Sequence, residues 1–187
     1  MSSAAQSAVL SLGSPAPDFA LPDTVSGKTV RLSEVKSDAA TVVLFICNHC
    51  PYVKHVAGQL VQLANDYGPK GVAIVAVSSN DAIEYPDDAP DKMKAEALRM
   101  GYPFPYLYDE SQGVARAYGA VCTPDTFVFD GNLKLAYRGQ LDDTRPGGGQ
   151  PATGADVRAA LDAILACKPV PSTQKPSVGC SIKWKQG

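Results

Sequence analysis

Two hydrophobic periods alternate along the first half of the chain, and each change of period marks a change of secondary structure. Residues 41–46 (TVVLFI) form an unbroken apolar run rich in β-branched side chains, which is typical of a strand covered on both faces. From Val53 the apolar positions recur every three or four residues until Gly68-Pro69, which predicts an amphipathic helix of about sixteen residues. Residues 71–77 (GVAIVAV) predict a second buried strand, so these elements form a βαβ unit with a right-handed crossover.

Two β-hairpins are predicted by short alternating runs that flank turn residues. In residues 13–32 the turn is centred on Ser26-Gly27. The second hairpin joins residues 126–129 to residues 133–138 through Asp130-Gly131, which is the clearest turn signal in the chain.

The remaining segments are shorter or lack a period. They predict helices near residues 91–100, 111–118 and 155–167, a strand at 106–108, and a loop rich in proline and aspartate at 84–90. Residues 169–187 contain prolines and no hydrophobic period. We therefore expect one domain over residues 1–168 and a C-terminal tail, residues 169–187, that packs on it.

The order of these elements matches the thioredoxin fold, an α/β class with a central mixed sheet flanked by helices. Here the sheet has an N-terminal β-hairpin before it and a C-terminal tail after it. Sites in open α/β sheets form beyond the carboxyl ends of the parallel strands. We expect four chain segments at that edge, namely residues 47–50, 78–80, 122–124 and 142–145.

Composition and charge argue against two classes of partner. The chain has 187 residues, 45% of them apolar, and a formal net charge of −2 with acidic and basic residues interspersed. Such a balance does not favour a nucleic-acid groove or a membrane-surface patch. No apolar run reaches the ~18 residues of a membrane span, and the N-terminal segment lacks the basic region of a secretion signal. We therefore expect a cytoplasmic protein that binds neither nucleic acid nor membrane.

The cysteine content points toward thiol chemistry. A chain of this length can fold without disulfide bonds, and its number of cysteines, five, is odd. This argues against an extracellular disulfide framework and favours reactive or metal-binding thiols. The five are Cys47, Cys50, Cys122, Cys167 and Cys180.

Five motifs resemble the peroxiredoxin-like branch of the thioredoxin superfamily, the group related to alkyl hydroperoxide reductase and thiol-specific antioxidant proteins. They are APDFALPD from residue 16, VLFICNHCPYVK from 43, VCTPDTFVFD from 121, YRGQLDDTRPG from 137 and PSVGCSIKWK from 176. The resemblance covers nearly the whole chain. It implies a thiol oxidoreductase and antioxidant without a cofactor, which acts on protein disulfides or peroxides and is reset by a reducing partner.

The resemblance implies that Cys50 is the nucleophile. In thioredoxins the attacking cysteine lies five residues beyond the strand's phenylalanine, and counting from Phe45 reaches Cys50. The second thioredoxin cysteine would fall at Val53, where there is no thiol. Pro51 is a good first helical residue, so Cys50 lies at a helix N-terminus, where unpaired N–H groups lower a thiol pKa.

Two departures distinguish the chain from a simple peroxidase. Peroxiredoxins place a threonine three residues before the peroxidatic cysteine, and here that position is Cys47. They also supply an arginine from the strand that corresponds to residues 123–129, which contains none. Arg145 is our candidate for the missing cation, with an ion pair to Asp142 or Asp143 as the alternative.

Four further residues are expected beside Cys50. His49 either stabilises the thiolate and carries a proton or is a partly exposed loop residue. Thr123-Pro124 matches the cis-proline position that faces the active cysteine in thioredoxin folds. Cys122 is expected close to Cys50, with a small buried core residue as the equal alternative. Cys167, at a helix end, is expected to be structural or inert.

The second thiol and the function class leave alternatives open. We favour Cys47 as the resolving cysteine because a short link needs little rearrangement, and Cys180 is the alternative. A binding module is the competing class. Cys47, His49 and Cys50 would suit Cu(I) or zinc, as in a thioredoxin-fold metallochaperone.

Overall fold

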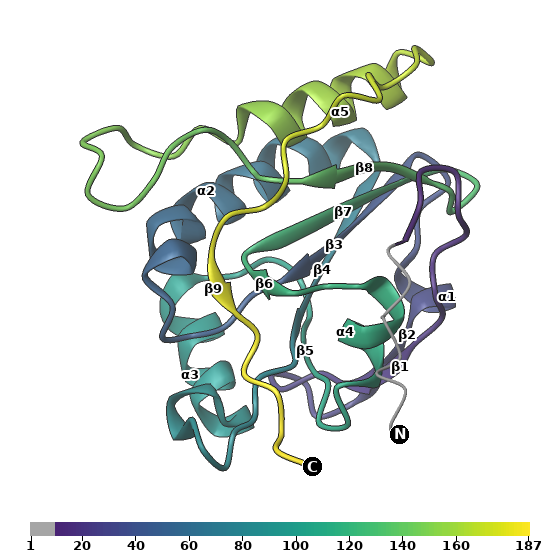
Figure 1. Ribbon diagram of the computed structural model, residues 1–187. Coiled ribbons are helices and arrows are strands. Elements are labelled where there is room, and N and C mark those ends of the chain that lie inside the picture. The colour runs from purple at the N-terminus through teal and green to yellow at the C-terminus, as the bar shows by residue number, and fades with distance from the viewer. Residues whose placement is uncertain (1–9) are drawn as a thin grey trace, which may run out of the picture.

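The computed structural model describes residues 10–187 and is built around a five-stranded mixed sheet (Figure 1). The strand order is β5-β4-β3-β7-β8. Three strands are parallel: β3 (Ala40–Phe45), β4 (Val72–Ser78) and β5 (Tyr106–Tyr108). Two antiparallel strands complete it: β7 (Asp125–Asp130) and β8 (Leu135–Gly139). The predicted α/β class with a central mixed sheet is therefore confirmed.

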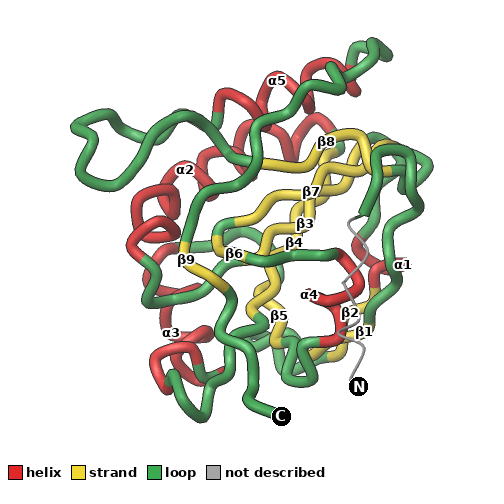
Figure 2. Tube along the Cα trace, viewed as in Figure 1, coloured by secondary structure: helices red, strands yellow, loops and turns green. Residues whose placement is uncertain are grey.

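Helices cover both faces of the sheet (Figure 2). One face packs α2 (Pro51–Tyr67), α3 (Pro90–Met100) and α5 (Ala155–Leu165), and the other packs α1 (Leu32–Val35) and α4 (Gly113–Tyr118). Strand β3 is buried along its whole length, with Leu44 in one core cluster and Phe45 in the other. This two-sided burial is the reason for its unbroken apolar run.

The predicted βαβ unit and both hairpins are confirmed. β3 and β4, which precede and follow α2 in the sequence, pair in parallel, and β7 pairs with β8. The N-terminal hairpin consists of β1 (Ala20–Pro22) and β2 (Thr29–Arg31). Two 3₁₀ turns were not expected, at Gly68–Lys70 and Pro86–Asp88, and the second lies in the loop rich in proline and aspartate.

The C-terminal segment contains a strand that the sequence pattern does not reveal. β9 (Cys180–Ser181) pairs antiparallel with β6 (Cys122–Thr123). Two residues are too few to show a period, so only the three-dimensional contact identifies this strand. The segment runs from α5 across the carboxyl ends of the parallel strands, as the yellow ribbon of Figure 1 shows.

Side-chain and backbone contacts hold this segment beyond β9. Ile182 is buried, and its N–H donates to the carbonyl of Val121. The N–H of Lys183 donates to the side chain of Asn80, which follows β4. The segment therefore joins the same sheet edge as the predicted site. Among residues 10–187, no helix has the length and apolar character needed to cross a membrane.

Candidate active site

Three of the four segments expected at the carboxyl edge of the sheet meet around two thiols. The Cys47 Sγ atom lies 3.4 Å from Thr123 Oγ1, and the Cys50 thiol donates to the Thr123 carbonyl at 3.4 Å. The Thr123–Pro124 peptide bond is cis, as the resemblance implies. Asn80, after β4, and Asn48, beside Cys47, bind the same buried carboxylate.

Cys50 is the N-cap residue of α2, with Pro51 in the first turn, and its side chain is fully buried. The thiol of Cys47 donates a hydrogen bond that lowers the pKa of Cys50 well below its ordinary value. Hydrogen bonds from the Cys180 side chain and from the backbone N–H groups of Val53 and Cys180 act in the same direction, against the effect of burial. The arrangement therefore favours a thiolate at Cys50.

Cys47 has the opposite character. Its hydrogen bond to Cys50, its burial and the nearby charge of Asp88 raise the pKa of the Cys47 thiol far above its ordinary value. Cys47 thus holds its proton and donates it toward Cys50. The pair combines a nucleophilic sulfur with a protonated sulfur on one short loop.

Cys180 is the third thiol at this position. Burial, followed by its hydrogen bond to Cys50, raises the pKa of Cys180 to about 11. In the β6–β9 ladder Cys180 is the partner of Thr123, so the tail delivers it to the nucleophile. Both candidate resolving thiols therefore adjoin Cys50.

Gly179 allows the tail to approach this closely. A Cβ atom at position 179 would lie 2.0 Å from the Thr123 carbonyl oxygen, a distance at which backbone must move. Ser177, two residues earlier, donates to the Asp125 carboxylate at 2.7 Å. The segment around Cys180 therefore packs closely against β6 and the start of β7.

A buried aspartate that the sequence pattern did not single out organises the loop between Cys47 and Cys50. Asp88 is fully buried and accepts hydrogen bonds from the Asn48 N–H at 2.8 Å and from Asn80 Nδ2 at 2.9 Å. Its Oδ2 lies 2.5 Å from His49 Nδ1. The His49 ring also stacks on Tyr85, with centroids 5.8 Å apart. The only sequence signal for Asp88 is its place in an aspartate-rich loop after β4.

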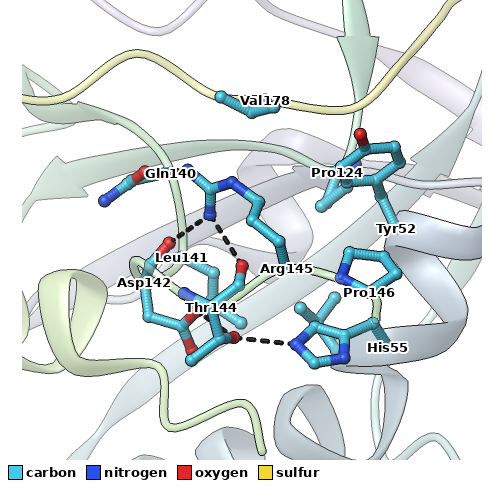
Figure 3. A pocket seen from close by; sticks show the side chains of 11 residues that line it. Tyr52, His55, Pro124, Gln140, Leu141, Asp142, Thr144, Arg145, Pro146 and Val178 are labelled. Carbon is cyan, nitrogen blue, oxygen red and sulfur yellow. Dashed lines mark hydrogen bonds between the residues drawn. The ribbon is translucent and has the colours of Figure 1, made fainter. Parts of the chain in front are cut away.

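Arg145 lies in the fourth segment, near the cis-proline. Its guanidinium donates to the carbonyls of Asp142 and Thr144 and to Gln140 Oε1, at 2.6–2.8 Å (Figure 3). Together with Pro124 it lines a small cavity of about 20 Å³. Within residues 10–187 no hydrogen bond links Arg145 to a cysteine, so these bonds hold the cation in its own loop.

His55 and Cys122 border the site without joining the thiol cluster. His55, on α2, is hydrogen-bonded to Thr144 Oγ1 at 2.8 Å (Figure 3). Burial, followed by the charge of Asp125, raises the pKa of Cys122 to about 12, and its thiol points to the Pro124 carbonyl. Cys167 is exposed beyond the end of α5. All five cysteines are free thiols.

Comparisons with known proteins identify the family of the chain. Residues 12–138 match the model of the AhpC/TSA family. The thiol-disulfide oxidoreductase ResA of Geobacillus thermodenitrificans is 30% identical over 128 residues, which cover 67% of each chain.

Two solved structures show the same architecture. An uncharacterized conserved protein from Geobacillus kaustophilus is 62% identical, with a TM-score of 0.93 over 96% of this chain and 95% of its own. A thiol:disulfide interchange protein of the thioredoxin family from Chlorobium tepidum has a TM-score of 0.63 at 19% identity, over 83% of this chain and 98% of its own. With its thioredoxin-like fold and its match over residues 12–138, the chain belongs to the AhpC/TSA family.

Proposed function

We propose that this chain is a thiol-disulfide oxidoreductase in which Cys50 is the nucleophile and a neighbouring thiol resolves the product. Its family and its named relative support the class of thiol oxidoreductase. The observation that carries the assignment to Cys50 is its position at the N-terminus of α2 with protonated thiols on both sides. This is the environment that activates a buried sulfur as an attacking group.

The reaction proceeds in two exchanges. The Cys50 thiolate attacks one sulfur of a substrate disulfide, forms a mixed disulfide, and releases the other sulfur as a thiolate, which takes up a proton. The resolving thiol, once deprotonated, attacks Cys50 Sγ and releases the reduced substrate. The chain is left with an internal disulfide, which a reducing dithiol partner converts back to two thiols.

Cys47 is our proposed resolving residue, with Cys180 as the alternative. Cys47 shares a loop with Cys50 and is hydrogen-bonded to it, so bridging requires movement of few residues. His49 is the proposed proton carrier, because it is partly exposed and lies on the same loop. We propose the cytoplasm as the compartment, since an odd number of free thiols fits a reducing environment.

Peroxide reduction is the second candidate, which family membership favours. There the Cys50 thiolate attacks a peroxide oxygen, giving a sulfenic acid and an alcohol or water. The site supports this reaction less well. Cys47 occupies the position of the threonine, and Arg145 is bonded within its own loop.

A trapping experiment tests the assignment. The Cys47→Ser variant, incubated with a small aromatic disulfide, is expected to accumulate a mixed disulfide at Cys50, identified by peptide mass mapping. Cys50→Ser is expected to abolish turnover with a dithiol reductant, and Cys122→Ser is expected to retain it. Turnover that survives Cys50→Ser would overturn the assignment. Comparing initial rates with hydrogen peroxide and with the disulfide separates the two candidate reactions.

A further inference from the structure

We propose that Cys47, His49 and Asp88 form a binding site for Zn²⁺ or a cation of similar chemistry. One ligand atom from each residue, Cys47 Sγ, His49 Nδ1 and an Asp88 carboxylate oxygen, lies within 4.8 Å of the other two. Cys47 and Asp88 are buried, and His49 is about one quarter exposed. The site lies at the carboxyl edge of the sheet and differs from the Cys47, His49 and Cys50 set expected from the sequence.

The His49 ring nitrogen faces the buried carboxylate. Nδ1 is buried and lies 2.5 Å from Asp88 Oδ2, and this contact is not an aligned hydrogen bond. Two atoms of the types that bind zinc therefore adjoin each other in a buried position. A cation placed between Nδ1 and the carboxylate would accept a lone pair from each of them.

The carboxylate is already oriented for this task. Asn48 N–H binds Asp88 Oδ1 and Asn80 Nδ2 binds Oδ2, so neighbouring groups fix the plane of the carboxylate. Hydrogen bonds of this kind position metal ligands in known sites. A carboxylate has about four lone-pair directions, and these two bonds leave acceptor capacity free.

The distances require only local movement. Zinc bonds of about 2.3 Å to sulfur and about 2.0–2.2 Å to nitrogen and oxygen place tetrahedral ligand atoms roughly 3.3–3.6 Å apart. The His49–Asp88 separation must open by roughly 1 Å, and the other separations, which are at most 4.8 Å, must close by up to about 1.2–1.5 Å. His49 sits in the loop before α2 and its side chain is about one quarter exposed, so the core does not fully enclose the ring that must move.

Charge and ligand type select the ion. A cation binds with loss of the Cys47 thiol proton, and the neutral imidazole carries its remaining proton on Nε2. One thiolate and one carboxylate then balance a divalent charge in a buried position. Sulfur, nitrogen and oxygen together suit zinc, whereas Cu(I) prefers sulfur-rich sets. Cys50 is directed at the Thr123 carbonyl and Cys180, so it is not required as a ligand.

Metal binding to the reduced full-length protein tests the proposal. Equilibrium dialysis against Zn²⁺ and the absorption spectrum with Co²⁺ are the two readouts. We expect one ion per chain and a thiolate-to-cobalt charge-transfer band. Cys47→Ser is expected to remove the band and weaken binding at least tenfold, and His49→Ala is expected to weaken binding at least tenfold. Asp88 is fully buried, so an Asp88→Asn variant can fail to fold. His49 is partly exposed, and His49→Ala therefore tests metal binding in a protein that still folds.

Two matched thiol variants separate this site from its alternatives. Cys50→Ser and Cys180→Ser are each expected to bind Zn²⁺ within about twofold of the parent and to keep the Co²⁺ charge-transfer band. Loss of binding in Cys50→Ser would overturn the proposed ligand set and favour Cys47, His49 and Cys50. Stoichiometric binding that survives both Cys47→Ser and His49→Ala would overturn the site altogether. Neither readout depends on the proposed redox activity.

Discussion

Thr123 and Cys180 are paired residues of the β6–β9 ladder, and both contact the Cys50 sulfur. The Thr123 main-chain carbonyl lies 3.4 Å from the Cys50 sulfur, while Cys180 donates to Cys50 through its thiol and its backbone N–H. The edge that holds the tail is therefore the edge that borders the nucleophile. Displacing the tail removes hydrogen bonds from Cys50, so the position of β9 and the reactivity of the thiol are linked.

Cys50 should remain reactive at low pH. Because its pKa is lowered, the thiolate persists as the pH falls below the ordinary range for cysteine. The alkylation rate at Cys50 should change less than about threefold between pH 8 and pH 6, whereas an ordinary thiol slows by up to about 100-fold. Timed alkylation with a small reagent, followed by peptide mapping, measures this. The exposed Cys167 is the internal comparison. A parallel decline at both positions would argue against activation.

The identity of the resolving thiol can be read from oxidation products. After one equivalent of hydrogen peroxide, Cys47→Ser should leave Cys50 as a sulfenic acid or a mixed disulfide. Cys180→Ser should still form an internal bridge between Cys47 and Cys50. Mass mapping of disulfides gives the answer directly. A bridge that persists in Cys47→Ser and disappears in Cys180→Ser would identify the tail cysteine as the resolver.

Gly179→Ala should loosen the tail. The added methyl group would lie 2.0 Å from the Thr123 carbonyl oxygen, so β9 must shift, at a cost of about 1–3 kcal/mol in the free energy of unfolding. Gly58→Ala is the matched control, because Gly58 lies in α2 and, apart from its chain neighbours and the nearby backbone of its own helix, no atom lies within 4 Å of the new methyl group. This control should be neutral or stabilising. Denaturant unfolding and hydrogen exchange at Ile182 measure both effects, and equal stability of the two variants would contradict the close fit.

Asp125 should make the fold less stable as the pH rises. Burial raises the pKa of Asp125 to about 6, above the value near 4 of an unfolded aspartate. The protonated form is therefore favoured in the folded chain, and its contribution is lost as the pH rises from about 4 to 6. Asp125→Asn should raise the free energy of unfolding at pH 7 by about 1–3 kcal/mol, measured by denaturant titration. The control is Asp38→Asn, whose side chain is 99% exposed. Greater loss of stability at pH 7 than at pH 4 in Asp125→Asn would contradict this assignment.

The periodic elements could be predicted from the sequence, and the individual polar partners could not. Residues 41–46 and the helix after Cys50 have patterns set by burial, so β3 and α2 follow from the local sequence. The position of Cys50 at the start of this helix also follows from the local sequence, whereas its place beside Thr123 was expected only from the family resemblance. Asp88 gave no such signal, because its burial depends on Asn48 and Asn80 from two other segments.

The strand in the C-terminal tail also could not be predicted from the sequence. β9 depends on contacts with distant residues, among them the close approach of Gly179 to Thr123 and the burial of Ile182 in the core. These are contacts between residues more than fifty positions apart, which no local period records. The partners of Arg145 could not be predicted either. The same sequence would allow its guanidinium to bind the carbonyls of its own loop, as it does at Asp142 and Thr144, or to approach a distant thiol.

The placement of two thiols on either side of Cys50 has an entropic consequence. A bridge from Cys47 to Cys50 would close a ring of only four residues, whereas a bridge from Cys50 to Cys180 would close one of about 130 residues. Restricting the unfolded chain by the larger ring stabilises the fold by about 5 kcal/mol, compared with about 2 kcal/mol for the smaller ring. The two oxidised forms should consequently melt at clearly different temperatures. A thermal scan of the oxidised protein would then report which thiols have joined.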